Sequence, residues 1–245
     1  GSEMCIRDRG WRIPFVASAL LVGLGLWVRL NIHETPDFQK ALERRAPVRL
    51  PMWTVLRDHP VPMLLGTLGA FATFVLFYLM TVFSLGHGTA VLGYSREQFL
   101  LMQMAAMLFF ALGIPLSARY GDRWGTRRTM IVASLLILGF GLLFAPLFQP
   151  GSPWLVLGFL CLGLFLMGLT YGPCGTFLAE IYPVEVRYTG ASLSFNLAGI
   201  LGAAPAPYLA TWLAERFGLV AVGYYLCLTA VATLAALVAL QRRVR

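Results

Sequence analysis

The hydrophobic residues of this chain fall into seven long runs, and a short polar or charged stretch separates each run from the next. A helix needs about 20 largely apolar residues to cross the hydrocarbon core of a bilayer. The pattern therefore predicts an all-α membrane protein with seven transmembrane helices. The predicted spans are residues 13–32, 61–85, 98–118, 129–148, 154–179, 189–213 and 218–240.

Composition supports a membrane protein and argues against other classes. Hydrophobic residues make up 58% of the 245 residues and charged residues 12%, whereas soluble domains average about 45–50% and about 25%. The expected partner is therefore the lipid bilayer. The net charge of +8 can indicate nucleic-acid binding, but here the basic residues flank apolar runs, so no nucleic-acid partner is expected.

The basic residues concentrate on alternate connections. Those after the first, third and fifth spans, together with the C-terminus and Arg29, hold fourteen of the nineteen lysines and arginines. Because basic residues are retained on the cytoplasmic side, these connections and the C-terminus are predicted to be cytoplasmic. The chain is expected to be a multi-pass protein of the plasma membrane, the bacterial inner membrane.

Four parts of the chain differ in character. Residues 1–9, GSEMCIRDR, are interpreted as a non-native tail, and residues 10–32 as the last helix of an N-terminal bundle. Residues 33–60 are predicted to be a central cytoplasmic loop, in which four prolines exclude one continuous helix. Residues 61–245 are predicted to form a C-terminal six-helix bundle.

The most charged short stretch is RYGDRWGTRR, residues 119–128. Gly125 allows a tight turn between antiparallel helices. Asp122 can accept backbone N–H groups at a helix start or pair with Arg123. Arg127 and Arg128 hold the loop in the cytoplasm. The alternative interpretation is a solvated basic turn with topological value only.

The order of these residues resembles the cytoplasmic signature GxLxDRxGRRR of the major facilitator superfamily, in the copy between its eighth and ninth helices. Ala118, Tyr120 and Thr126 depart from that signature. The stretch from FLAEIYPVEVRYTG through PYLATWL, residues 177–213, resembles the tenth-to-eleventh helix junction of the metabolite:H+ symporter branch. Permeases for shikimate, α-ketoglutarate and proline/betaine belong to that branch.

Two further stretches, GWRIPF at 10–15 and ETPDF at 34–38, match the segments that flank the sixth helix of that branch. The resemblance implies helices six to twelve of a twelve-helix fold, without most of the N-terminal bundle. It also implies that Glu180 and Arg187, at the arginine-rich edge, belong to a salt-bridge cluster that holds the cytoplasmic side shut. Glu180 is expected to pair with Arg123, Arg127 or Arg187; the alternative is interface anchors without a gating role.

Few polar side chains lie within the spans expected to line a substrate cavity. The candidates are Tyr78, Gln103, Tyr171 and Asn196, because polar groups at membrane depth face a partner helix or water. Each has the alternative role of a hydrogen bond between helices. Phe74 and Phe77 are candidates for an apolar cavity wall or for the core.

No ionisable group lies securely in the middle of the last six spans, although a proton-coupled carrier needs one. The coupling group is therefore expected in the absent first bundle, and the segment is not expected to transport alone. The prediction is a secondary active transporter of a small polar metabolite, an organic acid or zwitterion, that moves it with H+ by alternating access.

Other classes fit less well. A seven-helix receptor or another non-transporter membrane protein remains the alternative. A retinal protein is excluded because the only lysine, Lys40, lies in a loop. No hydrolase or protease motif occurs, and no histidines or cysteines have metal-ligand spacing. No enzyme activity, metal or cofactor is therefore expected.

Overall fold

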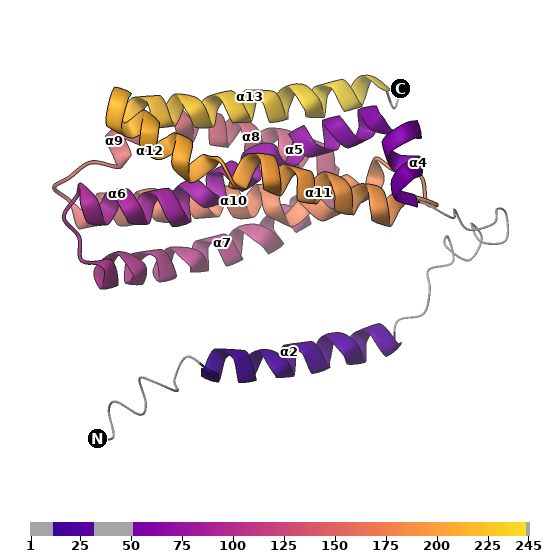
Figure 1. Ribbon diagram of the computed structural model, residues 1–245, viewed down its shortest axis with the longest axis horizontal. Helices are drawn as coiled ribbons and strands as arrows, with labels where there is room; N and C mark the ends of the chain where they lie inside the picture. The colour runs from indigo at the N-terminus through magenta and orange to yellow at the C-terminus, as the bar shows by residue number, and fades with distance from the viewer. Residues whose placement is uncertain (1–11, 32–50, 244–245) are drawn as a thin grey trace. The chain divides into compact units, whose positions relative to one another are not determined.

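The computed structural model describes residues 12–31 and 51–243 (Figure 1). Every regular element in these ranges is a helix, and they contain no strand. The all-α prediction is therefore confirmed for the described residues. The predicted tail, residues 1–9, and residues 33–50 of the predicted loop lie outside them.

The chain divides into two compact units, Gly1–Pro47 and Val48–Arg245. The described part of the first unit is one apolar helix, α2 (Arg12–Asn31), which coincides with the first predicted span. The side-chain amide of Asn31 donates to the Trp27 carbonyl at 2.8 Å in its last turn.

The second unit is a bundle of long helices, several of them in two pieces. α5 (Pro60–Tyr78) continues through the π-helical segment η1 (Leu79–Phe83) into α6 (Ser84–Ala90). The remaining helices are α7 (Arg96–Trp124), α8 (Thr126–Leu142), α9 (Phe144–Leu147), α10 (Pro153–Glu180), α11 (Arg187–Ala203), α12 (Ala206–Phe217) and α13 (Leu219–Arg243).

Five of the seven predicted spans correspond to helical stretches that are long and apolar enough to cross a membrane. They are Pro60–Ala90, Arg96–Trp124, Pro153–Glu180, Arg187–Phe217 and Leu219–Leu240. The other two are shorter. The helix α8 has 17 residues and ends before Leu143, and in the first unit the described apolar stretch is Ser18–Val28. The count of seven is therefore approximate.

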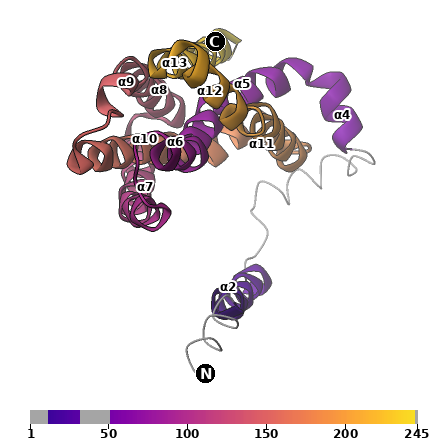
Figure 2. The same ribbon diagram turned by 60° about the vertical axis from the view of Figure 1, so that its left-hand side comes forward.

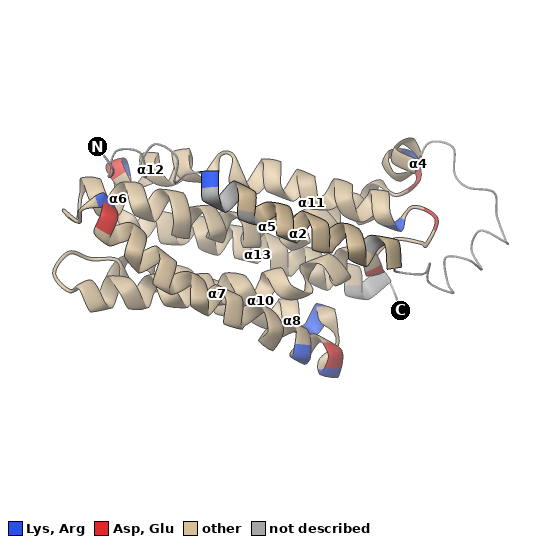
Figure 3. Ribbon diagram, turned by 90° about the horizontal axis from the view of Figure 1, so that it is seen from below, with Lys and Arg blue, Asp and Glu red and all other residues tan. Residues whose placement is uncertain are grey.

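Charged residues of the bundle lie at its two ends, and the helices between them are uncharged (Figure 3). One end, here called the arginine-rich end, brings together the last turns of α7 and α10 and the first turns of α8 and α11. It holds Arg119, Asp122, Arg123, Arg127, Arg128, Glu180, Glu185 and Arg187. The opposite end holds Arg96, Glu97, Glu215 and Arg216.

Local sequence signals mark several helix boundaries. Ser95 and Gln98 form a capping box that starts α7: the Ser95 side chain accepts from the Gln98 N–H at 3.2 Å, and the Gln98 side chain accepts from the Ser95 N–H at 3.2 Å. Pro205 lies between α11 and α12, where its missing N–H interrupts the helix. Pro51 is the first residue of α4 (Pro51–Asp58), and Pro60 begins α5, so α4 and α5 are separate helices.

Helices approach one another closely at positions that are occupied by glycine. A Cβ on Gly168 of α10 would lie 2.5 Å from the Phe110 carbonyl oxygen and 3.1 Å from the Gly113 Cα, both in α7. Gly172 faces α7 in the same way, whereas a Cβ on Gly158 would meet nothing within 4 Å. Small residues let backbones approach closely in lipid, and α10 accordingly runs beside both α7 and α8 (Figure 2).

The helix α4 lies within the predicted loop and is docked on the bundle. Its Val55 is fully buried beside Tyr182 and Val186, which join α10 to α11. The Tyr182 hydroxyl lies 2.6 Å from the Ser194 hydroxyl, and Ser194 donates to the Met63 carbonyl at 3.3 Å. Burial raises the pKa of Tyr182, and the hydrogen bond with Ser194 partly offsets this rise.

Candidate functional sites: a central cavity and an arginine-rich pocket

A cavity of about 480 Å³ lies between α5, α7, α10 and α11. Its wall is mostly aromatic. The lining residues are Phe74, Phe77, Tyr78, Phe110, Met167, Tyr171, Phe195, Gly199 and Ala203. Two pairs of aromatic rings pack against each other in this wall. The rings of Phe74 and Phe195 pack edge to face with centroids 4.9 Å apart, and the ring centroids of Phe110 and Tyr171 lie 5.7 Å apart.

The two tyrosines give this cavity its polar character. Among the described residues that line it, Tyr78 and Tyr171 are the ones whose side chains carry oxygen. Tyr171 is 39% exposed, and Phe77 packs beside Tyr78 with ring centroids 5.5 Å apart. A largely apolar hollow with a few polar groups is a common form of small-molecule site. The structure thus brings together Tyr78 and Tyr171 with Phe74 and Phe77, which the sequence left as candidates for the cavity wall or for the core.

Gln103, another predicted cavity residue, lies elsewhere. Its side chain is 7% exposed, and its amide nitrogen donates to the carbonyl oxygens of Met80 at 2.9 Å and Thr81 at 2.8 Å. Both carbonyls belong to η1, where the π-helical backbone departs from α-helical bonding. Gln103 thus joins α7 to η1, which is the helix-to-helix role that the sequence left open.

Asn196 also does not line the cavity. It is exposed on α11, and its amide donates to the Ser192 carbonyl of the preceding turn at 2.8 Å. Its neighbour Phe195 lines the cavity instead. Adjacent residues on a helix point about 100° apart, so this prediction missed the lining by one position.

A second, polar pocket of about 500 Å³ lies at the arginine-rich end between α7, α8 and α10. It is lined by Gly121, Asp122, Trp124, Gly125, Thr126, Arg127, Arg128, Ile131, Thr176 and Glu180. The structure therefore gathers five of the seven predicted motif residues in one pocket. The two others, Arg123 and Arg187, are exposed outside it.

The turn in this pocket is tighter than the predicted loop. α7 extends through Asp122 to Trp124, and α8 begins at Thr126, so Gly125 alone separates them. Gly125 has φ +92°, a backbone conformation that favours glycine. Asp122 consequently lies in the last turn of α7, and the expectation that it caps a helix start is wrong: the residue before α8 is Gly125.

The predicted ion pairs of Glu180 do not form. Instead the Glu180 carboxylate accepts a hydrogen bond from the Thr126 hydroxyl at 3.2 Å. The Arg187 guanidinium donates to the Tyr182 carbonyl at 3.4 Å, and the buried Nε of Arg127 has no hydrogen-bond partner. The exposed position of Glu180 gives the reason, because a solvated carboxylate gains little from an ion pair.

A bundle of apolar helices around a partly polar central cavity is typical of membrane transport proteins. Residues 89–245 match the family model described as the Major Facilitator Superfamily. The chain belongs to this family, whose members are transport proteins and not enzymes.

Curated relatives agree with this assignment. The chain is 47% identical over 233 residues to the inner membrane metabolite transport protein YhjE of Escherichia coli (strain K12), covering 93% of the chain and 53% of that protein. Identity to a citrate-proton symporter of Klebsiella pneumoniae is 30%, over 97% of the chain and 54% of the relative. The shikimate transporter of Escherichia coli (strain K12) is 29% identical, over 85% and 48%. The chain spans about half the length of these relatives.

Proposed function

We propose that this chain is the C-terminal part of a secondary active transporter that moves a small polar metabolite together with H+ by alternating access. The observation that carries the proposal is the cavity between α5, α7, α10 and α11, with Tyr78 and Tyr171 in its aromatic wall. Hydroxyl groups in an otherwise apolar wall orient a small polar molecule without holding it too tightly.

The second wall of the transport path would come from an N-terminal bundle. The coverage of about half of each relative supports this, and so does the distribution of burial. In the most apolar 18-residue stretch of each span, 22% of the residues of α7 and 28% of those of α11–α12 are buried. The corresponding values are 56% for α5–α6 and 50% for α10. α7 and α11 flank the cavity, so a second bundle would cover them, and the present segment alone would not transport.

In the proposed orientation the arginine-rich end and the C-terminus face the cytoplasm of a bacterial cell, with the bundle in the inner membrane. The excess of arginine at that end supports this orientation. The polar pocket there, with Asp122 and Glu180 beside Arg127, would then open and close against the N-terminal bundle.

Substrate class and coupling follow from charge. The cavity wall contributed by the described residues carries no carboxylate or basic group, so the N-terminal bundle would supply both the charge that binds an organic acid or zwitterion and the group that carries the proton. The relatives named for citrate–proton symport and for shikimate transport favour organic acids.

Uptake into proteoliposomes tests the proposal. The full-length protein is expected to accumulate at least one of shikimate, α-ketoglutarate, citrate and betaine, and only when the external buffer is more acidic. Liposomes containing the segment alone are the control and should accumulate none. Uptake of equal rate without a proton gradient would contradict proton coupling, and no uptake of any of the four would contradict the substrate class.

A further inference from the structure

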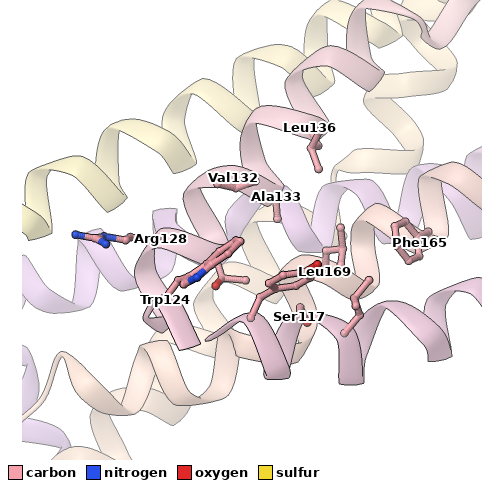
Figure 4. Close-up of a pocket in the computed structure, with 11 residues that line it drawn as sticks. Ser117, Trp124, Arg128, Val132, Ala133, Leu136, Phe165 and Leu169 are labelled. Atoms are coloured by element: carbon pink, nitrogen blue, oxygen red, sulfur yellow. The ribbon is translucent and has the colours of Figure 1, made fainter. Parts of the chain in front are cut away.

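An apolar groove of about 570 Å³ lies on the bundle between α7, α8 and α10 (Figure 4). It shares no lining residue with the central cavity. The groove is lined by Leu116, Ser117, Tyr120, Trp124, Arg128, Thr129, Val132, Ala133, Leu136, Phe165 and Leu169. A hollow of this composition within a membrane is filled by hydrocarbon and not by water, because its wall offers few hydrogen bonds.

One end of the groove is polar and positively charged. Arg128 lies at that end, and its guanidinium group points away from the apolar lining (Figure 4). Trp124 is 62% exposed there, and its ring lies 5.0 Å from that of Tyr120. Tryptophan and tyrosine are enriched at the level of lipid headgroups, so this end has the composition of the membrane–water interface.

The charges around this end are complementary to an anion. Four arginines lie between residues 119 and 128 with a single carboxylate, Asp122. Arg128 also lines the adjoining arginine-rich pocket, where the described carboxylates are Asp122 and Glu180. The Glu180 carboxylate accepts a hydrogen bond from the Thr126 hydroxyl. The charge of Arg128 is therefore not matched by an ion pair within the described bundle.

The apolar part extends along α8 away from Arg128. Val132 and Leu136 follow Arg128 at spacings of four residues and are 55% and 48% exposed, with Phe165 of α10 beside them. Eight residues of helix span about 12 Å, most of the roughly 15 Å depth of one leaflet. The groove thus has the length and the polarity gradient of a lipid with its acyl chain along α8.

We propose that this groove binds one anionic phospholipid, with its phosphate on Arg128 and an acyl chain along Val132, Leu136 and Phe165. The inference requires that the bundle lies in a membrane, and it does not depend on the proposed transport activity. Arg128 and Trp124 also line the arginine-rich pocket, so the lipid headgroup would contact the wall of the pocket that we propose as a gate.

Native mass spectrometry of the full-length protein tests the charged end. After titration with phosphatidylglycerol or phosphatidylcholine of identical chains, the unmodified protein is expected to retain more phosphatidylglycerol. Arg128→Gln should lower phosphatidylglycerol retention roughly fivefold, since a basic residue near the surface is worth about 1 kcal/mol, and leave phosphatidylcholine unchanged. Arg119→Gln is the matched control, because Arg119 is exposed near the end of α7, at the same end of the bundle, but does not line the groove.

The apolar part has its own test. Val132→Trp fills the groove at an exposed position and should reduce retention of both lipids, whereas Leu228→Trp, at an exposed position of α13, should not. Thermal unfolding of each variant verifies that it is folded. Equal retention of the two lipids by the unmodified protein, unchanged lipid retention by Arg128→Gln, or a dimer that forms in place of the lipid complex would each overturn the proposal.

Discussion

α7 and α10 have nearly the same length, 29 and 28 residues, and one internal proline each, and their most apolar stretches have equal mean hydropathy, yet they occupy different environments. Half of the residues in the most apolar 18-residue stretch of α10 are buried, against 22% in the corresponding stretch of α7. α10 contacts α5, α7, α8 and α11, whereas α7 exposes a stripe of Met104, Leu108 and Leu112, each more than 60% exposed.

The difference shows that apolar character alone does not decide which membrane helix forms the centre of a bundle. Lipid is as apolar as leucine, so side-chain hydrophobicity gives no preference for helix over lipid. Small residues and polar side chains provide that preference. α10 carries Gly168 and Gly172 on the face toward α7. α7 contributes Gln103, whose side-chain amide makes two hydrogen bonds to η1.

A larger side chain in place of the glycine at the α7–α10 contact should cause the largest loss of stability. Gly168→Leu would add a side chain whose Cβ alone would lie 2.5 Å from the Phe110 carbonyl oxygen. The helices α7 and α10 must then separate, and we expect a loss of about 3 kcal/mol in unfolding free energy. Denaturant titration of the full-length protein in detergent micelles measures it.

Gly158→Leu is the matched control, on the same helix but with nothing within 4 Å of its Cβ position. Its stability should be unchanged or slightly raised, since leucine has the higher helix propensity. Equal stability of the two variants would mean that α7 and α10 do not approach through Gly168.

Removing the polar link of α7 should have an intermediate effect. Gln103→Leu leaves the Met80 and Thr81 carbonyls of η1 without their donor. Polar contacts between membrane helices are worth roughly 0.6–2 kcal/mol, and the same titration should show a loss of about 1 kcal/mol for these two hydrogen bonds. Met104→Leu, at the adjacent position with 67% exposure, should change stability by less than about 0.5 kcal/mol. A Gln103→Leu variant as stable as Met104→Leu would contradict the link.

The helices themselves could be predicted from sequence, because bilayer thickness sets the length of an apolar run and charge marks its ends. Boundaries were less certain. The predicted third span stopped at residue 118, but α7 continues to Trp124, since long arginine side chains reach solvent from a helix without ending it. Residue 143 breaks the predicted fourth span, and no strong signal in the sequence marks that break.

The cavity could be predicted only in part. Tyr171 and Gln103 are both single polar residues in apolar runs, yet Tyr171 lines the cavity and Gln103 bonds to η1. A helix that is apolar on all sides has no periodic pattern to show which face meets a neighbour. The partner of Glu180 was missed for a similar reason: three arginines were plausible by sequence distance, but the turn at Gly125 places Thr126 beside it.

The smallest effect on stability, and the sharpest on function, is expected in the cavity where α7 and α10 meet. Tyr171→Phe keeps the ring that packs on Phe110 and removes one hydroxyl, so unfolding free energy should change by less than about 0.5 kcal/mol. One lost hydrogen bond to substrate corresponds to roughly a three- to tenfold rise in KM for uptake. Tyr188→Phe, 88% exposed on α11 and outside the cavity, should leave KM unchanged. If both variants leave KM unchanged, the Tyr171 hydroxyl does not contact the substrate, and only the aromatic wall shared by α7 and α10 shapes the site.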